Sequence, residues 1–232
     1  MRGKWAQTVK WRQSRLRDFR HLQYNPNPKI VGMIKKRYQM FKVRHFSWNS
    51  VFLFPDACEL TLDPNTAHKN LRLSEGNRKV AWVEGLQPYA PHTDRFDACH
   101  QVLCEQGLEE RCYFEVETVE PFSIGLTYKS IGRKGNRNDC RLVKSDKSWC
   151  MTCSEKGCYV WHGDEHVCIS SLCSRSSRVG VYLDWKAGTL SFYKVLSNSL
   201  TKLHTFTAKF SEALYPAVEL HPHSSASFCQ LT

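Results

Sequence analysis

The sequence lacks a long hydrophobic run. Nowhere in its 232 residues do about 18 apolar residues follow one another, which is the length that a membrane-spanning helix needs. The N-terminus carries positive charge but no uninterrupted apolar segment of the kind that signal peptides contain. We therefore expect a cytoplasmic protein, and we expect its 11 cysteines to be reduced thiols that pack as small hydrophobic side chains.

Acidic residues are almost missing from the first part of the chain. Residues 1–50 hold 13 Lys and Arg residues but a single acid, Asp18. The rest of the chain holds 20 basic and 21 acidic residues, so the formal net charge of +11 belongs to this first segment. The remainder of the protein is expected to be close to neutral.

Residues 1–54 also lack repeats, heptads and the cysteine spacing of a zinc finger. The Asn-Pro-Asn-Pro segment at 25–28 interrupts any helix, so we predict a basic leader that is irregular or forms short helices. Bases interleaved with aromatic residues are typical of contacts with nucleic acid or an anionic membrane, and residues 1–44 have this composition. An Arg-rich, acid-poor start is also loosely typical of a mitochondrial transit peptide. We favour a linker or remnant without a role of its own.

The chain has no Gly-rich phosphate-binding loop and no nucleophile elbow. The segment Gly132–Gly135 lacks the Gly-Lys-Ser/Thr ending of a phosphate loop and is expected to be a turn with solvated charges. With 11 cysteines and 10 histidines, chance Cys–His pairs are common, so no such pair by itself indicates a nucleophile. We predict that the chain is not an enzyme and that it binds no cofactor.

A group of cysteines and histidines in the second half of the chain invites interpretation as a metal site. Structural zinc sites use four nitrogen or sulfur ligands from two closely spaced pairs. The spacing here is irregular, and Cys150 and Cys153 lie an odd number of residues apart, so on a strand their side chains point to opposite faces. We therefore predict packed or exposed thiols and no metal site. The group comprises Cys150, Cys153, Cys158, His162, His166, Cys168 and Cys173.

Short segments that alternate apolar and polar residues fill the chain from Cys58 onward. The clearest are Val179–Asp184 and Leu190–Tyr193, joined by the turn Lys186–Gly188, whose glycine suits a left-handed backbone. Many short strands separated by turn residues predict an all-β, two-layer antiparallel sandwich. The predicted strands are 71–74, 79–83, 111–118, 123–128, 148–153, 158–161, 178–185, 189–195, 202–205, 215–220 and 227–231. The side chains assigned to the core or its margin are Trp82, Tyr113, Trp149, Val181, Leu183, Phe192, Leu203, Phe206 and Tyr215.

Four motifs mark this part of the chain in order: Leu62-Asp63-Pro64, Leu71–Ser74, Tyr113–Val116 and Leu183–Tyr193. Together they resemble the PRY–SPRY family, with Phe114 and Trp185 where that family has Trp and Tyr. The resemblance implies a concanavalin-like jelly roll at residues 55–232, with a PRY part at about 58–105 and a SPRY part at about 106–231. The chain looks nearest to the C-terminal PRY–SPRY domains of fish NACHT–leucine-rich-repeat receptors and tripartite-motif proteins.

The same resemblance implies a function in recognition. PRY–SPRY domains bind partners, usually proteins, through loops at one side of the sandwich, here 84–96, 129–141, 154–157, 162–166 and 221–225. We expect a protein ligand, no small-molecule substrate, and a setting in innate immune sensing or regulation. Two alternatives stay open: the substrate-recognition part of a tripartite-motif ubiquitin ligase without its RING, and a fragment of a toxin-like subunit. The candidate contact residues are Tyr89, His92, Arg133, Lys134, Arg137, Trp161, His162, His221 and His223.

Each of these residues also has a structural interpretation. Tyr89 and Trp161 have the size and character of lids on a hydrophobic core, and the Arg–Lys run at 133–137 has the composition of a solvated loop tip. The set of loops is therefore a stronger prediction than any of its members.

Overall fold

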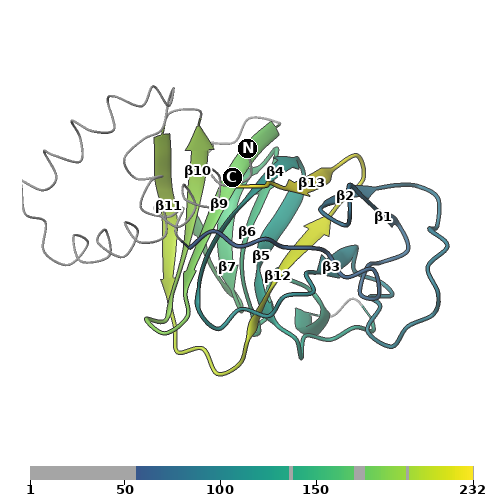
Figure 1. The fold of residues 1–232 in the computed structure, drawn as a ribbon, viewed down its shortest axis with the longest axis horizontal. Helices are drawn as coiled ribbons and strands as arrows, with labels where there is room; N and C mark the ends of the chain where they lie inside the picture. The colour runs from purple at the N-terminus through teal and green to yellow at the C-terminus, as the bar shows by residue number, and fades with distance from the viewer. Residues whose placement is uncertain (1–55, 136–137, 170–175, 197–198, 232) are drawn as a thin grey trace, which may run out of the picture. The chain divides into compact units, whose positions relative to one another are not determined.

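The computed structural model describes residues 56–135, 138–169, 176–196 and 199–231 (Figure 1). These residues form two antiparallel β-sheets and one short 3-10 helix, Asn138–Cys140. The prediction of an all-β, two-layer antiparallel sandwich is confirmed. The predicted leader at 1–54, with its nucleic-acid, membrane and transit-peptide interpretations, lies outside the described residues. No helix in the described segments is long and apolar enough to cross a membrane.

One sheet has seven strands in the order β1-β2-β13-β4-β9-β10-β11. The last described strand, β13, lies between two early ones, because it pairs with both β2 and β4. Its strands are β1 (Leu71–Ser74), β2 (Lys79–Trp82), β4 (Arg111–Val119), β9 (Ser176–Asp184), β10 (Thr189–Leu196), β11 (Ser199–Thr207) and β13 (Ser225–Phe228).

The other sheet has six strands in the order β3-β12-β5-β6-β7-β8. Strands β5, β6, β7 and β8 follow one another along the chain as a meander, and β8 forms the edge. Its strands are β3 (Gln101–Leu103), β5 (Phe122–Tyr128), β6 (Ser148–Ser154), β7 (Gly157–His162), β8 (Glu165–Cys168) and β12 (Leu214–Leu220).

The β9–β10 hairpin forms where the sequence pattern is clearest. Leu183 pairs with Leu190 and Val181 pairs with Phe192, so the apolar residues of both strands face the same side. Gly188 closes the turn with φ +67°, and a Cβ at this position would lie 2.2 Å from the Ala208 carbonyl oxygen. Only glycine fits both the left-handed backbone and the close approach.

The 11 predicted strands all occur, with ends shifted by a few residues, but β3 and β8 were missed. Strand β3 has only three residues, all buried, and gives no alternation to detect. Strand β8 is exposed along its whole length, so it carries no apolar face. It includes part of the predicted 162–166 loop, and that prediction is wrong: His162 ends β7, and Glu165 and His166 belong to β8.

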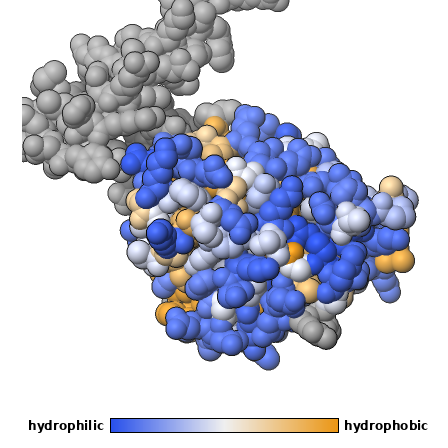
Figure 2. Space-filling view, turned by 90° about the horizontal axis from the view of Figure 1, so that it is seen from below, coloured by the Kyte–Doolittle hydropathy of each residue, from blue (hydrophilic) through white to orange (hydrophobic). Residues whose placement is uncertain are grey.

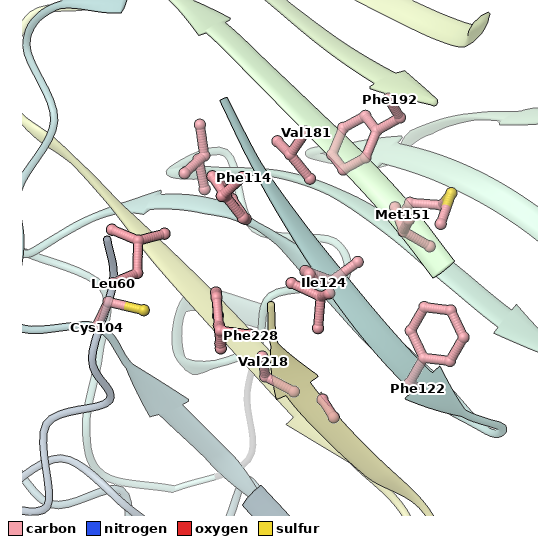
Figure 3. Packing of buried hydrophobic residues seen from close by; sticks show 14 of the residues in the cluster. Leu60, Cys104, Phe114, Phe122, Ile124, Met151, Val181, Phe192, Val218 and Phe228 are labelled. Carbon is pink, nitrogen blue, oxygen red and sulfur yellow. The ribbon is translucent and has the colours of Figure 1, made fainter. Parts of the chain in front are cut away.

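The main core lies between the two sheets (Figure 3). It takes the inward-facing side chains of both layers, among them Phe114 and Phe192 from the seven-stranded sheet and Ile124 and Met151 from the six-stranded one. Eight of the nine side chains assigned to the core or its margin pack there or against a second cluster described below: Trp149, Val181, Leu183 and Phe192 are buried, and Trp82, Leu203, Phe206 and Tyr215 are partly buried. Tyr113 is buried as well but belongs to neither cluster, and its hydroxyl donates to Glu115 at 2.7 Å.

The expectation of reduced cysteines is wrong for four of them. Cys58 is joined to Cys112, and Cys153 to Cys158, as disulfides with Cα–Cα distances of 5.6 and 4.2 Å. The pairing follows from strand register: Cys153 and Cys158 are direct partners on β6 and β7, and the Ala57–Tyr113 bridge brings Cys58 beside Cys112. Cys99, Cys104, Cys140, Cys150, Cys168 and Cys229 are thiols.

Candidate functional site

A second hydrophobic cluster lies on the outer face of the six-stranded sheet, away from the main core. Leu103, Cys150 and Ala217 come from the strands, and their sequence neighbours Val102, Met151 and Val218 point into the main core. Loop residues cover the cluster: Phe96, Ile131 and Leu142 are buried in it, with Trp161 and Tyr215 packed at its margin. We call this cluster and the loops over it the outer face. Cys150 lies in the outer cluster and Cys153 in the main core, so their predicted opposite orientation is confirmed.

Arg95 fixes the loop at 84–97. Its side chain is buried, with 6% exposure, and its guanidinium donates hydrogen bonds to the carbonyls of Pro64, Ala67 and Ala90 at 2.6–2.8 Å. Burial lowers the pKa of Arg95. The guanidinium also lies 4.8 Å from the centre of the Tyr89 ring. Three carbonyl contacts from one buried side chain hold this loop in a single conformation.

Tyr89 has a structural role in this loop. Its hydroxyl donates to the Leu71 carbonyl at 2.8 Å and accepts from the Leu73 amide at 3.2 Å, both on β1. Burial raises the pKa of Tyr89. The ring clamps the 84–97 loop to the edge of the seven-stranded sheet, so Tyr89 positions other residues rather than offering a free contact surface.

Arg133 joins the second loop to the first. Its guanidinium lies 4.8 Å from the centre of the Phe96 ring and donates to the carbonyls of Ile131 and Lys129. Lys134 Nζ donates to the Arg95 carbonyl at 3.1 Å, and the Gly135 amide donates to Asp97 at 2.8 Å. The loops at 84–97 and 129–135 therefore form one unit, which we call the paired loops. Arg137 lies outside the described residues.

Trp161 lies on the outer face, and His162, the next residue of β7, points to the opposite, inner side of the sheet. Trp161 stacks on His166 of β8 with ring centres 4.2 Å apart, and Lys144 Nζ lies 5.9 Å from its ring centre. His162 stacks on Trp149 at 4.5 Å, and its Nδ1 lies 2.9 Å from the Ser148 carbonyl oxygen. Packing thus holds both residues, and Trp161 presents a partly exposed edge beside the outer cluster.

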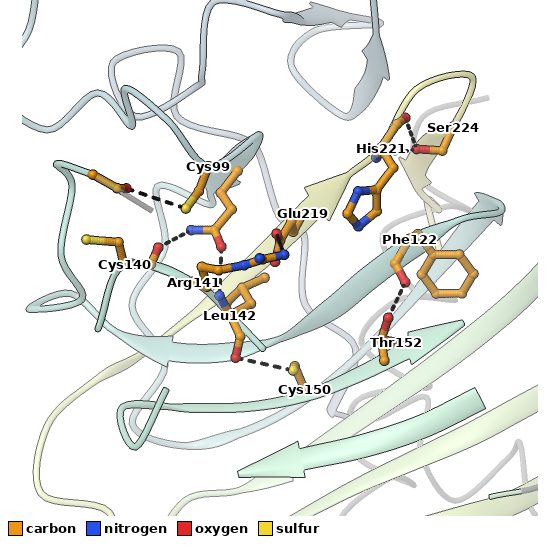
Figure 4. A network of polar contacts seen from close by, with 12 residues as sticks. Cys99, Phe122, Cys140, Arg141, Leu142, Cys150, Thr152, Glu219, His221 and Ser224 are labelled. Carbon is orange, nitrogen blue, oxygen red and sulfur yellow. Dashed lines mark hydrogen bonds and ion pairs between the residues drawn. The ribbon is translucent and has the colours of Figure 1, made fainter. Parts of the chain in front are cut away.

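Gln101 anchors a further segment to this face. Figure 4 shows Cys140, Arg141 and Leu142 of this segment, with Arg141 next to Glu219. The amide nitrogen of Gln101 donates to the Cys140 carbonyl at 2.8 Å, and its amide oxygen accepts from the Leu142 amide at 2.7 Å. Beside it Arg141 forms an ion pair of 3.0 Å with Glu219, which is 3% exposed. Neither contact was predicted, because both join residues far apart in the sequence and neither lies in a motif.

The thiols beneath this segment are poor nucleophiles. Burial, and then the Glu219 carboxylate, raise the pKa of Cys99 to about 12, and the same two causes raise the pKa of Cys150. Because the thiolate is the reactive form of cysteine, both groups stay protonated and unreactive at neutral pH.

His221 and His223 lie just beyond the C-terminal end of β12, in a group of rings that the sequence did not reveal. His223 adopts φ +69°, and its ring centre lies 6.2 Å from that of Trp82. Trp82 also contacts His100 at 6.1 Å, and His100 contacts His68 at 4.6 Å. The structure thus brings Tyr89, His92, Arg133 and Lys134 together on the paired loops and places Trp161 on the outer face. His162 points instead to the inner side of the sheet, against Trp149, while His223 lies beside Trp82 and His221 lies near His100.

These histidines give a pH-dependent stability that can be measured. Burial lowers the pKa of His68 and of His100, and a neighbouring histidine lowers each further: His100 for His68, and His221 for His100. Asp97 raises the pKa of His68 and Arg95 lowers it, while Glu219 raises the pKa of His100. Below pH about 6.5 the unfolded chain therefore binds more protons than the folded one, and stability is lost as pH falls. We expect the unfolding free energy to drop between pH 7.5 and 5.5 in denaturant titrations. The variant carrying His68→Gln and His100→Gln should show a smaller drop, and an equal drop would contradict this account.

One exposed hydrophobic residue on the paired loops was missed. Leu86 is 69% exposed, although large hydrophobic side chains in the described residues are mostly buried. His92 and Lys134 are also exposed on these loops. Figure 2 shows one face of the molecule as mainly hydrophilic, with small separate hydrophobic patches. The exposure of Leu86 on these fixed loops makes it a candidate contact residue, and the sequence pattern alone does not reveal that exposure.

Comparison with models of protein families identifies the domain to which these loops belong. A model of the SPRY-associated domain PRY matches residues 60–108, and a model of the SPRY domain matches residues 111–231, more than half of the chain. The chain belongs to the PRY–SPRY family. SPRY domains are protein-interaction modules.

Two kinds of curated relative carry a similar PRY–SPRY segment. Stonustoxin subunit beta of Synanceia horrida is 45% identical over 161 residues, which cover 69% of this chain and 23% of the toxin subunit. Tripartite motif-containing protein 16 of Mus musculus is 33% identical over 218 residues, which cover 92% of this chain and 38% of that protein. The chain thus spans about a quarter to two fifths of the length of these relatives.

Solved structures agree with the fold. A stonustoxin structure superimposes with a TM-score of 0.68 at 41% identity, covering 75% of this chain and 27% of the toxin chain. The PSpry domain of TRIM65 superimposes with a TM-score of 0.73 and covers 81% of this chain and 99% of that domain. At 23% identity the second likeness establishes the fold alone.

Proposed function

We propose that this PRY–SPRY domain recognises a protein ligand, without catalysis, through the paired loops and the adjoining Trp161 edge of the outer face. The observation that carries the proposal is the way these loops are fixed. Tyr89 holds the 84–97 loop to β1, Arg95 joins it to Pro64 and Ala67, and Arg133 lies over Phe96. The exposed side chains of Leu86, His92 and Lys134 are therefore already in place before binding. A preorganised surface loses less conformational entropy when a partner binds.

The composition of the surface agrees with a protein partner. It combines an exposed aliphatic residue, an aromatic edge and cationic groups, the mixture that forms the centre and rim of protein interfaces. A cytoplasmic setting in innate immune sensing or regulation, close to NACHT–leucine-rich-repeat receptors, is part of the proposal and derives from the family resemblance. A small-molecule substrate is not part of it.

Two substitutions on the paired loops test the surface. Leu86→Asp and Lys134→Glu should each weaken ligand binding about tenfold or more, because each changes an exposed contact residue. Leu86→Asp should unfold at the temperature of the wild type, since its side chain is exposed, whereas Lys134→Glu also loses the hydrogen bond to the Arg95 carbonyl and should lower the unfolding temperature slightly. The measurement is quantitative capture of partners from a cell extract on immobilised protein, with thermal unfolding of each variant recorded in parallel.

Leu196→Asp is the matched control for Leu86→Asp. Leu196 is 51% exposed but lies at the end of β10 in the seven-stranded sheet, away from the outer face. Partners that the wild type and Leu196→Asp retain, and that both loop variants lose, support the proposal. Partners retained equally by all four proteins would show that the binding surface lies elsewhere.

One alternative is substrate recognition for a tripartite-motif ubiquitin ligase. It is favoured by the match to tripartite motif-containing protein 16, which covers 92% of this chain. On this alternative the chain selects the substrate and a separate RING domain transfers ubiquitin. The purified chain should then show no autoubiquitination with E1, E2 and ubiquitin, and activity from the chain alone would contradict both this alternative and the non-catalytic proposal.

The other alternative is a role as part of a toxin-like subunit, which the 45% identity to stonustoxin subunit beta favours. Release of a trapped dye from lipid vesicles by the purified chain would support it. Intact vesicles at concentrations where partner capture succeeds would leave the recognition proposal as the better account.

A further inference from the structure

A carboxylate and two sulfur atoms meet at one end of the sandwich, apart from the outer face. Ligand atoms of Glu120, Cys153 and Cys158 all lie within 4.8 Å of one another. Within the described ranges, no other group of three His, Cys, Asp or Glu residues meets this criterion. Figure 3 shows Phe122, which directly follows the turn that carries Glu120 and pairs with Cys153.

Strand pairing creates this group. Cys153 near the end of β6 pairs directly with Cys158 near the start of β7, and on its other side Cys153 pairs with Phe122, the first residue of β5. Glu120 lies in the β4–β5 turn, two residues before Phe122. The β4–β5 turn, the end of β6 and the start of β7 therefore bring Glu120, Cys153 and Cys158 together, and both cysteines are buried.

Glu120 lacks a donor at this point. Its Oε1 atom is buried and has no hydrogen-bond partner, although buried carboxylate oxygens normally accept at least one hydrogen bond. A cation bound next to the carboxylate would supply this atom with a partner.

We propose that, once the Cys153–Cys158 disulfide is reduced, the two sulfurs and the Glu120 carboxylate bind a zinc-class divalent cation. Two thiolates and one carboxylate are ligands that Zn²⁺ accepts, and a water molecule completes its tetrahedral coordination. The site is separate from the paired loops and does not depend on the proposed function.

The chemistry is balanced as follows. A thiol or phosphine reductant supplies two electrons, two protons enter, and the S–S bond becomes two thiols while the reductant is oxidised. Metal binding then releases both thiol protons and forms two metal–sulfur bonds. The disulfide and the metal complex therefore exclude each other, so occupancy of this site reports the redox state of the pair. A reducing compartment such as the cytosol favours the dithiol form.

The second disulfide provides an internal comparison. Cys58 and Cys112 are also joined across adjacent backbone segments, and reduction releases them in the same way. Among the described residues they have no third ligand within the same distance limit. If two released thiols were enough to bind the metal, both cysteine pairs would bind it. The proposed site, which also needs Glu120, predicts binding at Cys153 and Cys158 alone.

Titration with Co²⁺ tests the proposal, because tetrahedral cobalt thiolates absorb in the visible range. The full chain, reduced with a phosphine, should bind one equivalent that gives this absorption, and Zn²⁺ should displace it. Cys153→Ala should abolish the absorption, Glu120→Gln should weaken binding about tenfold or more, and Cys58→Ala should leave it unchanged. The oxidised chain should give no absorption.

A second readout does not depend on variants that fold poorly. In the reduced wild type, Zn²⁺ should slow alkylation of Cys153 and Cys158, measured by peptide mass spectrometry, and should not slow alkylation of Cys58 and Cys112. Absence of a cobalt signal, a signal that survives Cys153→Ala, a signal indifferent to Glu120→Gln, or protection of the wrong cysteine pair would each overturn the proposal.

Discussion

Replacing Phe192 by alanine should lower the free energy of unfolding by about 3–5 kcal/mol. Phe192 is fully buried in the main core, pairs with Val181 on β9 and with His204 on β11, and makes an edge contact with Phe206 at 6.3 Å between ring centres. Truncation removes apolar surface and leaves a cavity between the sheets, which tightly packed strands cannot close. Denaturant unfolding followed by tryptophan fluorescence measures the loss.

The same strand offers a matched control. Leu196 lies at the end of β10 and is 51% exposed, so Leu196→Ala should change the unfolding free energy by no more than about 0.5 kcal/mol. Equal losses for the two variants would mean that the main core does not lie where Phe192 places it. A loss confined to Phe192→Ala would also show why ligand-binding tests on this domain need a stability measurement beside them.

Local sequence patterns predicted most of the fold. The β9–β10 hairpin is an example, because alternation, a tight turn and Gly188 all indicate the same structure within a dozen residues. Patterns failed where the structure depends on partners far away in the chain. Strand β8 is exposed throughout and is defined only by its pairing with β7, so no local signal marks it.

The candidate site was predictable only in outline. Of the predicted loops, the structure brings together the described parts of 84–96 and 129–141, and the roles of their residues depend on contacts across the fold. Tyr89 is bound to β1 by two hydrogen bonds, and Arg133 packs over Phe96, so both support the surface. Leu86 has no motif and became a candidate only through its exposure.

Cysteine pairing shows the same limit. The prediction of reduced thiols concerned the compartment and not which cysteines are neighbours. The register of β6 and β7 decides that Cys153 faces Cys158, and an offset of one residue would turn one of the two side chains to the other face. Sequence spacing alone does not specify that register.

The second large effect is expected at Gly125, in the middle of β5. A Cβ added there would lie 2.3 Å from the Trp149 carbonyl oxygen and 2.6 Å from the Cys150 Cα, both backbone atoms of the neighbouring strand β6. Backbone in a paired strand cannot move aside as the end of a flexible side chain does. Gly125→Ala should therefore lower the unfolding free energy by about 3 kcal/mol, at the upper end of the cost of overpacking.

Gly85→Ala is the control, because nothing lies within 4 Å of its added Cβ and the residue is exposed on the paired loops. Its unfolding free energy should stay within about 0.5 kcal/mol of the wild type in the same denaturant titration.

The contrast between the two variants also tests whether the β5–β6 pairing supports the outer face. Gly125 lies between Ala217 on β12 and Cys150 on β6, the strands that supply the base of the outer cluster. Forcing β5 away from β6 should disturb that base, so Gly125→Ala should also weaken ligand binding under conditions where the chain is still folded. Wild-type stability and binding in this variant would mean that the two strands separate more easily than their close contact implies.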